Sequence, residues 1–179
     1  FELEIDIAFG GMDQRKAHMY MREVADKYDW TKATCIHTPM MSGLKGPGER
    51  MDSFDHKMSK SDPGNAILLD DDPDTLRAKM RKAFLEVGNP DSAVFEIAQY
   101  IVLPKLDSIA VTPDPKFGEP SNWDDPQSFV DAVSDGSIHP LDAKMAVAEG
   151  LSEVLAPISQ HFSQKPELLA AMNRLTGSQ

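Results

Sequence analysis

The first 26 residues constrain the fold most strongly, because they read as a strand, a glycine turn and a helix. Apolar residues alternate with acidic ones from Phe1 to Phe9, which is the pattern of a half-buried strand. Gly10 and Gly11 then form the turn, and a helix is predicted to about Asp26. This order places ligands at the carboxyl end of a parallel strand and at the N-terminus of a helix. The predicted fold class is therefore α/β.

The glycine turn carries side chains that suit a nucleotide and an amino acid. Gly11 lets the backbone approach a ribose closely, and Asp13 can accept hydrogen bonds from ribose hydroxyls. Gln14 offers a donor and an acceptor to the amino and carboxylate groups of an amino acid. Composition alone favours a plainer interpretation, with Asp13 as a helix cap and Gln14 as a surface residue.

A lysine-rich loop is predicted at residues 57–65, because proline and glycine follow the lysines and glycines precede them. It reads Lys57, Met58, Ser59, Lys60 and Ser61, followed by DPGN. Two ammonium groups on a loop suit a polyanion, since each can contribute ~1.5–3 kcal/mol through a charge-assisted hydrogen bond. A loop that closes only on the transition state increases the rate rather than the affinity. For a generic Lys-x-x-Lys, a solvated basic turn would be the better interpretation.

Composition excludes several classes of protein. The chain has 179 residues, of which 41% are hydrophobic and 26% charged, as in an ordinary globular protein. Its one cysteine, Cys35, excludes an internal disulfide and a cysteine-based zinc cluster, and it fits a reducing cytosol. No stretch resembles a signal peptide or a membrane span, so no membrane partner is expected.

The net charge of −11 is unusual for a partner of nucleic acid, although it allows a local basic patch. One predicted helix carries such a patch, made of Arg77, Lys79, Arg81 and Lys82. Contact with RNA phosphates and a simple exposed helix face explain this patch equally well. Residues 66–69 are predicted to form a short strand before it.

Three aspartates precede Pro73, and we interpret them as a helix start with Asp72 as the cap. A metal site is the alternative, and it is disfavoured because no further group of ligands follows nearby. No metal ligands are therefore predicted.

A second candidate site opens a long predicted helix at His139 and Asp142. A carboxylate in the first helical turn stabilises the helix dipole, which is the plainer explanation of Asp142. Recognition of one unstacked RNA base requires an aromatic ring for stacking and, for guanine, a carboxylate. Phe117 supplies the ring if its loop folds back on the helix start.

Four motifs together resemble a known family. Residues 57–61 match the KMSKS signature of class I aminoacyl-tRNA synthetases. Residues 10–19 (GGMDQRKAHM), 36–39 (IHTP) and 139–144 (HPLDAK), with Phe117-Gly118, are similar to the archaeal and eukaryotic branch of tyrosyl-tRNA synthetases. The resemblance runs from about the first residue to Phe162.

The resemblance implies two domains. Residues 1–71 would form the second half of a Rossmann-like catalytic domain, and residues 72–179 an α-helical anticodon-binding domain. The implied reaction joins tyrosine to tRNA(Tyr) through tyrosyl-adenylate. ATP would be a substrate accompanied by Mg2+, with no tightly bound cofactor.

The resemblance also assigns roles to individual residues. The pyrophosphate part of ATP would be held by Lys57 and Lys60, supplemented by Ser59 and Ser61. The ribose would lie at Gly11 and Asp13, the adenine at the backbone of Met40 and Met41, and tyrosine at Gln14. The first anticodon base, a guanine, would be surrounded by Phe117, His139 and Asp142. No nucleophile or general base is among these residues, so the implied mechanism is positional and electrostatic.

The family's His-x-Gly-His signature and its tyrosine-hydroxyl ligands are expected upstream of Phe1, so this chain alone is expected to be inactive. The full-length parent is expected to be a cytoplasmic homodimer. Two alternatives stay open: a truncated, non-catalytic tRNA-binding module and a tryptophanyl-tRNA synthetase relative. Arg15 and Lys16 after Gln14 favour the tyrosyl enzyme over the tryptophanyl one.

Overall fold

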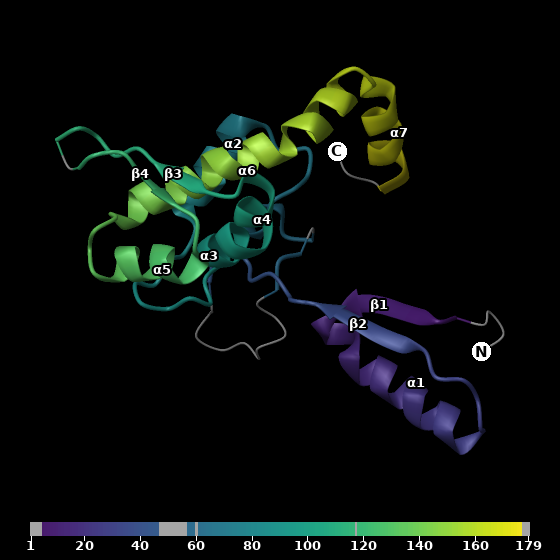
Figure 1. Ribbon diagram of the computed structural model, residues 1–179. Coiled ribbons are helices and arrows are strands. Elements are labelled where there is room, and N and C mark those ends of the chain that lie inside the picture. Colours follow the sequence, from purple (N-terminus) through teal and green to yellow (C-terminus); the bar gives the residue numbers. More distant parts are fainter. Residues whose placement is uncertain (1–4, 47–56, 60, 117, 177–179) are drawn as a thin grey trace.

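A computed structural model of the chain describes residues 5–46, 57–59, 61–116 and 118–176. Two candidate site residues, Lys60 and Phe117, lie outside the described residues. The elements form two groups (Figure 1), a small strand–helix unit near the N-terminus and a larger, mainly helical body.

The strand–helix unit contains β1 (Ile7–Gly11), β2 (Thr34–Thr38) and α1 (Arg15–Lys27). The two strands pair in parallel, and a short 3-10 turn, η1 (Met12–Gln14), leads from β1 into α1. The predicted order of strand, glycine turn and helix is therefore confirmed, with Ile7 as the first residue of the strand.

One face of this two-stranded sheet is exposed, which differs from the half-buried strand predicted. The exposed fractions are 57% for Ile7, 69% for Phe9 and 45% for Ile36. Residues of the opposite face are partly buried, and His37 on β2 contacts His18 on α1. The apolar alternation is real, but α1 packs on the other face of the sheet.

The body begins with a 3-10 turn, η2 (Pro63–Asn65), and α2 (Pro73–Lys82). One continuous helical stretch follows, composed of α3 (Ala93–Ile97), a π-helical turn η3 (Ala98–Val102) and α4 (Leu103–Leu106). The remaining elements are β3 (Ile109–Val111), β4 (Ser121–Trp123), α5 (Pro126–Ser134), α6 (Pro140–Ser163) and α7 (Pro166–Thr176). Strands β3 and β4 pair antiparallel. The described residues contain no helix that could cross a membrane.

Helix α6 lies at the centre of the body, in contact with α2, η3 and β3 (Figure 1). Gly150 lets α6 pack closely against η3, because a Cβ there would lie 2.6 Å from a methyl group of Val102. The same hydrophobic core contains Leu44, and Met41 and Met58 pack against it. The described part of the lysine loop is therefore anchored on the helical body. The division at residue 71 stays a prediction.

The predicted start of α2 is confirmed. An Asp72 oxygen accepts a hydrogen bond from the Thr75 backbone N–H at 2.8 Å, and Pro73 occupies the first turn. The Thr75 hydroxyl also donates to Asp72, at 3.0 Å. The two hydrogen bonds from Thr75 lower the pKa of Asp72.

The predicted strand at residues 66–69 is wrong. Its backbone groups bond to side chains instead of a neighbouring strand. The Leu68 N–H donates to Asp71 at 2.8 Å, and the Ala66 carbonyl accepts from Lys79 Nζ at 3.0 Å. An apolar run alone does not distinguish these arrangements.

Apolar residues on the exposed sheet face and in the buried core are expected to respond differently to mutation. Phe9→Thr is expected to change the free energy of unfolding by less than about 0.5 kcal/mol, because Phe9 is largely exposed. Leu151→Ala is expected to cost about 2–5 kcal/mol, because Leu151 is 1% exposed and its loss leaves a cavity. Urea denaturation of both variants measures the difference, and equal losses would contradict this burial pattern.

Candidate functional site

The turn between β1 and α1 carries Asp13 and Gln14 beside the lysine loop. Lys57 Nζ donates to Asp13 Oδ2 at 3.1 Å, and Gln14 Nε2 donates to the same oxygen at 3.4 Å. The Lys57 hydrogen bond, followed by that of Gln14, lowers the pKa of Asp13. The cap interpretation of Asp13 is wrong, since Gly11 caps η1 and Gln14 caps α1 without a side-chain bond.

Gly11 leaves room for the Asp13 carboxylate at this turn. A Cβ at this position would lie 2.7 Å from Asp13 Oδ1, which is too close for two non-bonded atoms. The glycine therefore leaves the Asp13 carboxylate free to turn toward the loop.

The start of the lysine loop pairs with the segment that contains Met40 and Met41. Ser42 and Lys57 form an isolated antiparallel bridge, and the Met58 N–H donates to the Met41 carbonyl at 2.7 Å. The structure thus brings the predicted adenine-binding backbone beside the predicted pyrophosphate-binding loop. The Met41 side chain packs against the core.

The end of the loop is held by Asp62 and Asn65. Lys45 Nζ contacts Asp62 Oδ2 at 2.5 Å, and this hydrogen bond lowers the pKa of Asp62. The Asn65 side-chain oxygen accepts from the Lys45 N–H at 2.7 Å, and the Asn65 backbone carbonyl accepts from the Leu44 N–H at 3.0 Å. Within the loop, the Ser59 hydroxyl donates to the Ser61 hydroxyl at 3.3 Å.

These contacts bring three segments to one place: the turn after β1, residues 40–45 and the loop. They provide a carboxylate, an ammonium group, hydroxyls and backbone groups, which suit the ribose and phosphates of a nucleotide. An incoming phosphate would compete with Asp13 for Lys57, because the ammonium group already donates to that carboxylate. Within the described residues, no group of three or more potential ligands could hold a metal ion.

Sequence reasoning missed a histidine pair beside this turn. His18 Nδ1 and His37 Nε2 lie 3.1 Å apart. His37 is in register with Gly10, where a Cβ would lie 3.3 Å from the His18 ring. Only the pairing of β1 with β2 brings these histidines together.

The second candidate site lies at the start of α6. His139 caps this helix, since its Nδ1 accepts from the Leu141 N–H at 3.2 Å. Asp142 lies in the first turn and is half-buried. A cavity of about 570 Å³ adjoins both residues, and the loop residues Pro113 and Gly118 also line it. The residues next to Phe117 on the loop therefore do return to the start of the helix.

Two of the four cations of the basic patch on α2 are paired with carboxylates of the protein. Arg77 donates to both carboxylate oxygens of Glu149, at 2.6 and 3.0 Å, and these bonds raise the pKa of Arg77. Lys79 Nζ lies 2.6 Å from Asp71, whose side chain is 8% exposed. Both cations are therefore already paired, whereas Arg81 and Lys82 of the same patch are exposed.

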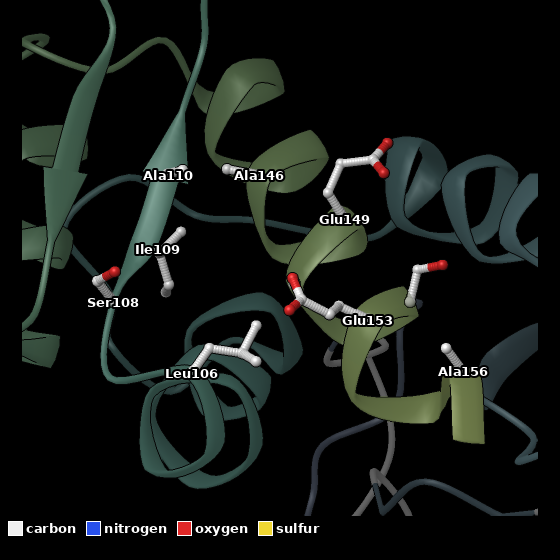
Figure 2. Close-up of a pocket in the computed structure, with 10 residues that line it drawn as sticks. Leu106, Ser108, Ile109, Ala110, Ala146, Glu149, Glu153 and Ala156 are labelled. Carbon is white, nitrogen blue, oxygen red and sulfur yellow. The ribbon is translucent and has the colours of Figure 1, made fainter. Parts of the chain in front are cut away.

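A further cavity of about 520 Å³ lies between α4, β3 and α6 (Figure 2). Figure 2 shows Glu149 and Glu153 on α6 at one side and Leu106 and Ile109 at the other. None of the predicted site residues lines this cavity.

Comparison with known proteins decides the family. Residues 1–156 match the family described as tRNA synthetases class I (W and Y). The chain belongs to this family. It is 40% identical to tyrosine–tRNA ligase of Aeropyrum pernix over 99% of its own length and 51% of the relative. It is 38% identical to the corresponding ligase of Sulfurisphaera tokodaii, over 96% of the chain and 50% of the relative.

Solved structures agree with these relatives. The crystal structure of tyrosyl-tRNA synthetase from Aeropyrum pernix matches with a TM-score of 0.82 and 38% identity, over 99% of this chain and 50% of that one. The structure of tyrosyl-tRNA synthetase complexed with L-tyrosine from Pyrococcus horikoshii matches with a TM-score of 0.82 and 33% identity. The match covers 97% of this chain and 52% of that one. The chain thus spans about half the length of its relatives, and its resemblance to archaeal tyrosyl-tRNA synthetases is confirmed.

The contact between Asp13 and Lys57 can be tested by measuring the pKa of Asp13. Because Lys57 lowers the pKa of Asp13, Lys57→Ala is expected to raise it toward the ordinary value. The contact stabilises the folded chain above the ordinary pKa, and this contribution disappears as the pH falls through the lowered pKa. NMR titration of the side-chain carboxyl carbons measures both aspartates. The control Lys45→Ala should raise the pKa of Asp62 and leave that of Asp13 unchanged.

Proposed function

We propose that the parent of this chain is a tyrosine–tRNA ligase, and that residues 5–46 and 57–65 supply part of its nucleotide site. The observation that supports this most directly is the contact of Lys57 with Asp13. It spans from the loop to the turn after β1, so a ribose at Asp13 would have its phosphates directed toward Lys57.

In the first step of the proposed reaction, a carboxylate oxygen of tyrosine attacks the α-phosphorus of ATP and pyrophosphate leaves. Lys57 and Lys60 hold the departing pyrophosphate, with Ser59 and Ser61 as further donors. Gly11 and Asp13 receive the ribose, the backbone at Met40 and Met41 the adenine, and Gln14 the tyrosine. Mg2+ accompanies ATP and neutralises phosphate charge.

In the second step, the tyrosyl group passes from the adenylate to the terminal ribose of tRNA(Tyr), and AMP leaves. The same residues act by position and charge, because none of them forms a covalent intermediate. The proposal includes a catalytic part at residues 1–71, an anticodon-binding part at residues 72–179, a homodimeric parent and a cytoplasmic location.

The proposed anticodon-binding site is the cavity at the start of α6. His139 and Asp142 lie beside it, together with the loop that carries Phe117. A carboxylate accepts from the N1–H and N2–H groups of guanine, and an aromatic ring can stack on the unpaired base. His139 already caps the helix, so the Asp142 carboxylate is not needed as its N-cap.

The lysines can be tested in the full-length parent by pre-steady-state kinetics. Lys57→Ala and Lys60→Ala are each expected to slow adenylate formation by roughly 10- to 100-fold, because the ammonium groups act mainly in the transition state. The dissociation constant of tyrosine is expected to stay unchanged. Lys32→Ala is the matched control, since Lys32 pairs with Asp26 at the far end of α1.

ATP–pyrophosphate exchange with tyrosine and with tryptophan separates the proposal from the tryptophanyl alternative. Exchange that depends on tryptophan alone would contradict the proposed substrate. Weaker tyrosine binding with an unchanged adenylation rate would contradict the proposed role of the lysines.

Asp142→Asn tests the reading of the anticodon. It replaces an acceptor-only group with a mixed one, which is expected to cost ~1–3 kcal/mol for cognate tRNA and to relax discrimination at the first anticodon base. Asp74→Asn is the control, because Asp74 occupies the same first turn in α2. Aminoacylation of the cognate transcript and of one with this base changed gives the selectivity. Equal selectivity in parent and Asp142→Asn would leave only a structural role.

A further inference from the structure

Glu96 of α3 holds the segment that lies against the lysine loop. Its Oε2 accepts from the backbone N–H of Ser42 at 2.6 Å, and its Oε1 accepts from the Ser42 hydroxyl at 3.0 Å. Both carboxylate oxygens are used, so the position and the orientation of Ser42 are restrained together. The chain neighbours of Glu96, Phe95 and Ile97, are buried in the core, which makes α3 a rigid support.

Ser42 transmits this restraint to the loop. It forms the antiparallel bridge with Lys57, and the Met58 N–H bonds to the Met41 carbonyl in the same pairing. This pairing sets the register of the loop against residues 41–42. From that backbone position, the Lys57 side chain reaches Asp13 at 3.1 Å.

We propose that Glu96 is a positioning residue for Lys57, acting through Ser42 without touching nucleotide or amino acid. The consequence for adenylate formation rests on the proposed function, whereas the effect on the Lys57–Asp13 contact does not. A positional mechanism is sensitive to such a residue, since a displacement of about 1 Å can cost about 10²-fold in rate.

The chemistry of the anchor distinguishes substitutions. Glutamine can keep both bonds, because its carbonyl oxygen accepts from the Ser42 N–H and its amide group donates to the Ser42 hydroxyl oxygen. Glu96→Ala removes both bonds. Ser42→Ala removes only the bond from the hydroxyl.

The first experiment uses this chain and measures the pKa of Asp13 by carboxyl NMR. Glu96→Ala is expected to raise it toward the value in Lys57→Ala, because Lys57 loses its register. A lost negative charge would by itself lower a neighbouring carboxyl pKa, so a rise reports the displaced ammonium group. Glu96→Gln is expected to cause no rise, and Ser42→Ala a smaller one.

Glu86→Ala is the matched control for charge. Glu86 lies in the loop after α2, and its side chain accepts a hydrogen bond from Asn89 at 3.0 Å instead of from Ser42. An Asp13 pKa that does not rise in folded Glu96→Ala would overturn the proposal. If circular dichroism shows that Glu96→Ala is unfolded, an unchanged Asp13 pKa in Ser42→Ala would overturn it instead.

The second experiment measures adenylate formation in the full-length parent. Glu96→Ala is expected to slow it by roughly 10- to 100-fold with unchanged tyrosine affinity, and Glu96→Gln to restore most of the rate. A normal rate in Glu96→Ala, with a slow rate in Lys57→Ala, would overturn the positioning role in catalysis. A normal rate in Lys57→Ala would instead contradict the proposed function, and the Asp13 titration would still decide whether Glu96 positions Lys57.

Discussion

The packing of α6 against the π-helical turn at Gly150 is the contact on which the rest of the structure depends. It lets one long helix contact α2, η3 and β3 together, with Leu151 in the shared core. Leu44 belongs to the same core, so the segment before the lysine loop is fixed by helices that come later in the chain. The helical body is thus the support for the loop.

Polar contacts then determine where the charges of the site lie. Glu96 restrains Ser42, Ser42 pairs with Lys57, and Lys57 reaches Asp13 in the turn after β1. Each contact joins segments that are separated in the sequence. An electrostatic mechanism gains from this arrangement, because donors that are already in position need no reorganisation during the reaction.

Local patterns predicted most of the elements and the motifs of the site. The turn at Gly11, the cap at Asp72 and the long helix after His139 follow from short-range rules, and the structure contains all of them. What the sequence did not reveal depends on tertiary contacts. Glu96 and Ser42 are 54 residues apart and lie outside the predicted site residues, and no local pattern joins them.

The wrong predictions have the same origin as the missed residues, because both depend on tertiary contacts. Residues 66–69 have the composition of a strand, but side chains from Asp71 and Lys79 take up their backbone groups. The exposed face around Phe9 shows that alternation predicts which residues share a face and leaves open what covers it.

The ion pairs on α2 have a consequence for RNA binding that concerns counterions. A protein gains affinity for RNA when free cations displace the ions that surround the phosphates, and the loss of affinity with added salt counts those cations. Arg77 and Lys79 are already neutralised by Glu149 and Asp71, and the chain carries a net charge of −11. RNA that approaches this helix would release ions mainly at Arg81 and Lys82, the two exposed cations of the same patch. The loss of affinity with added salt would then count two of the four cations of this patch instead of all four.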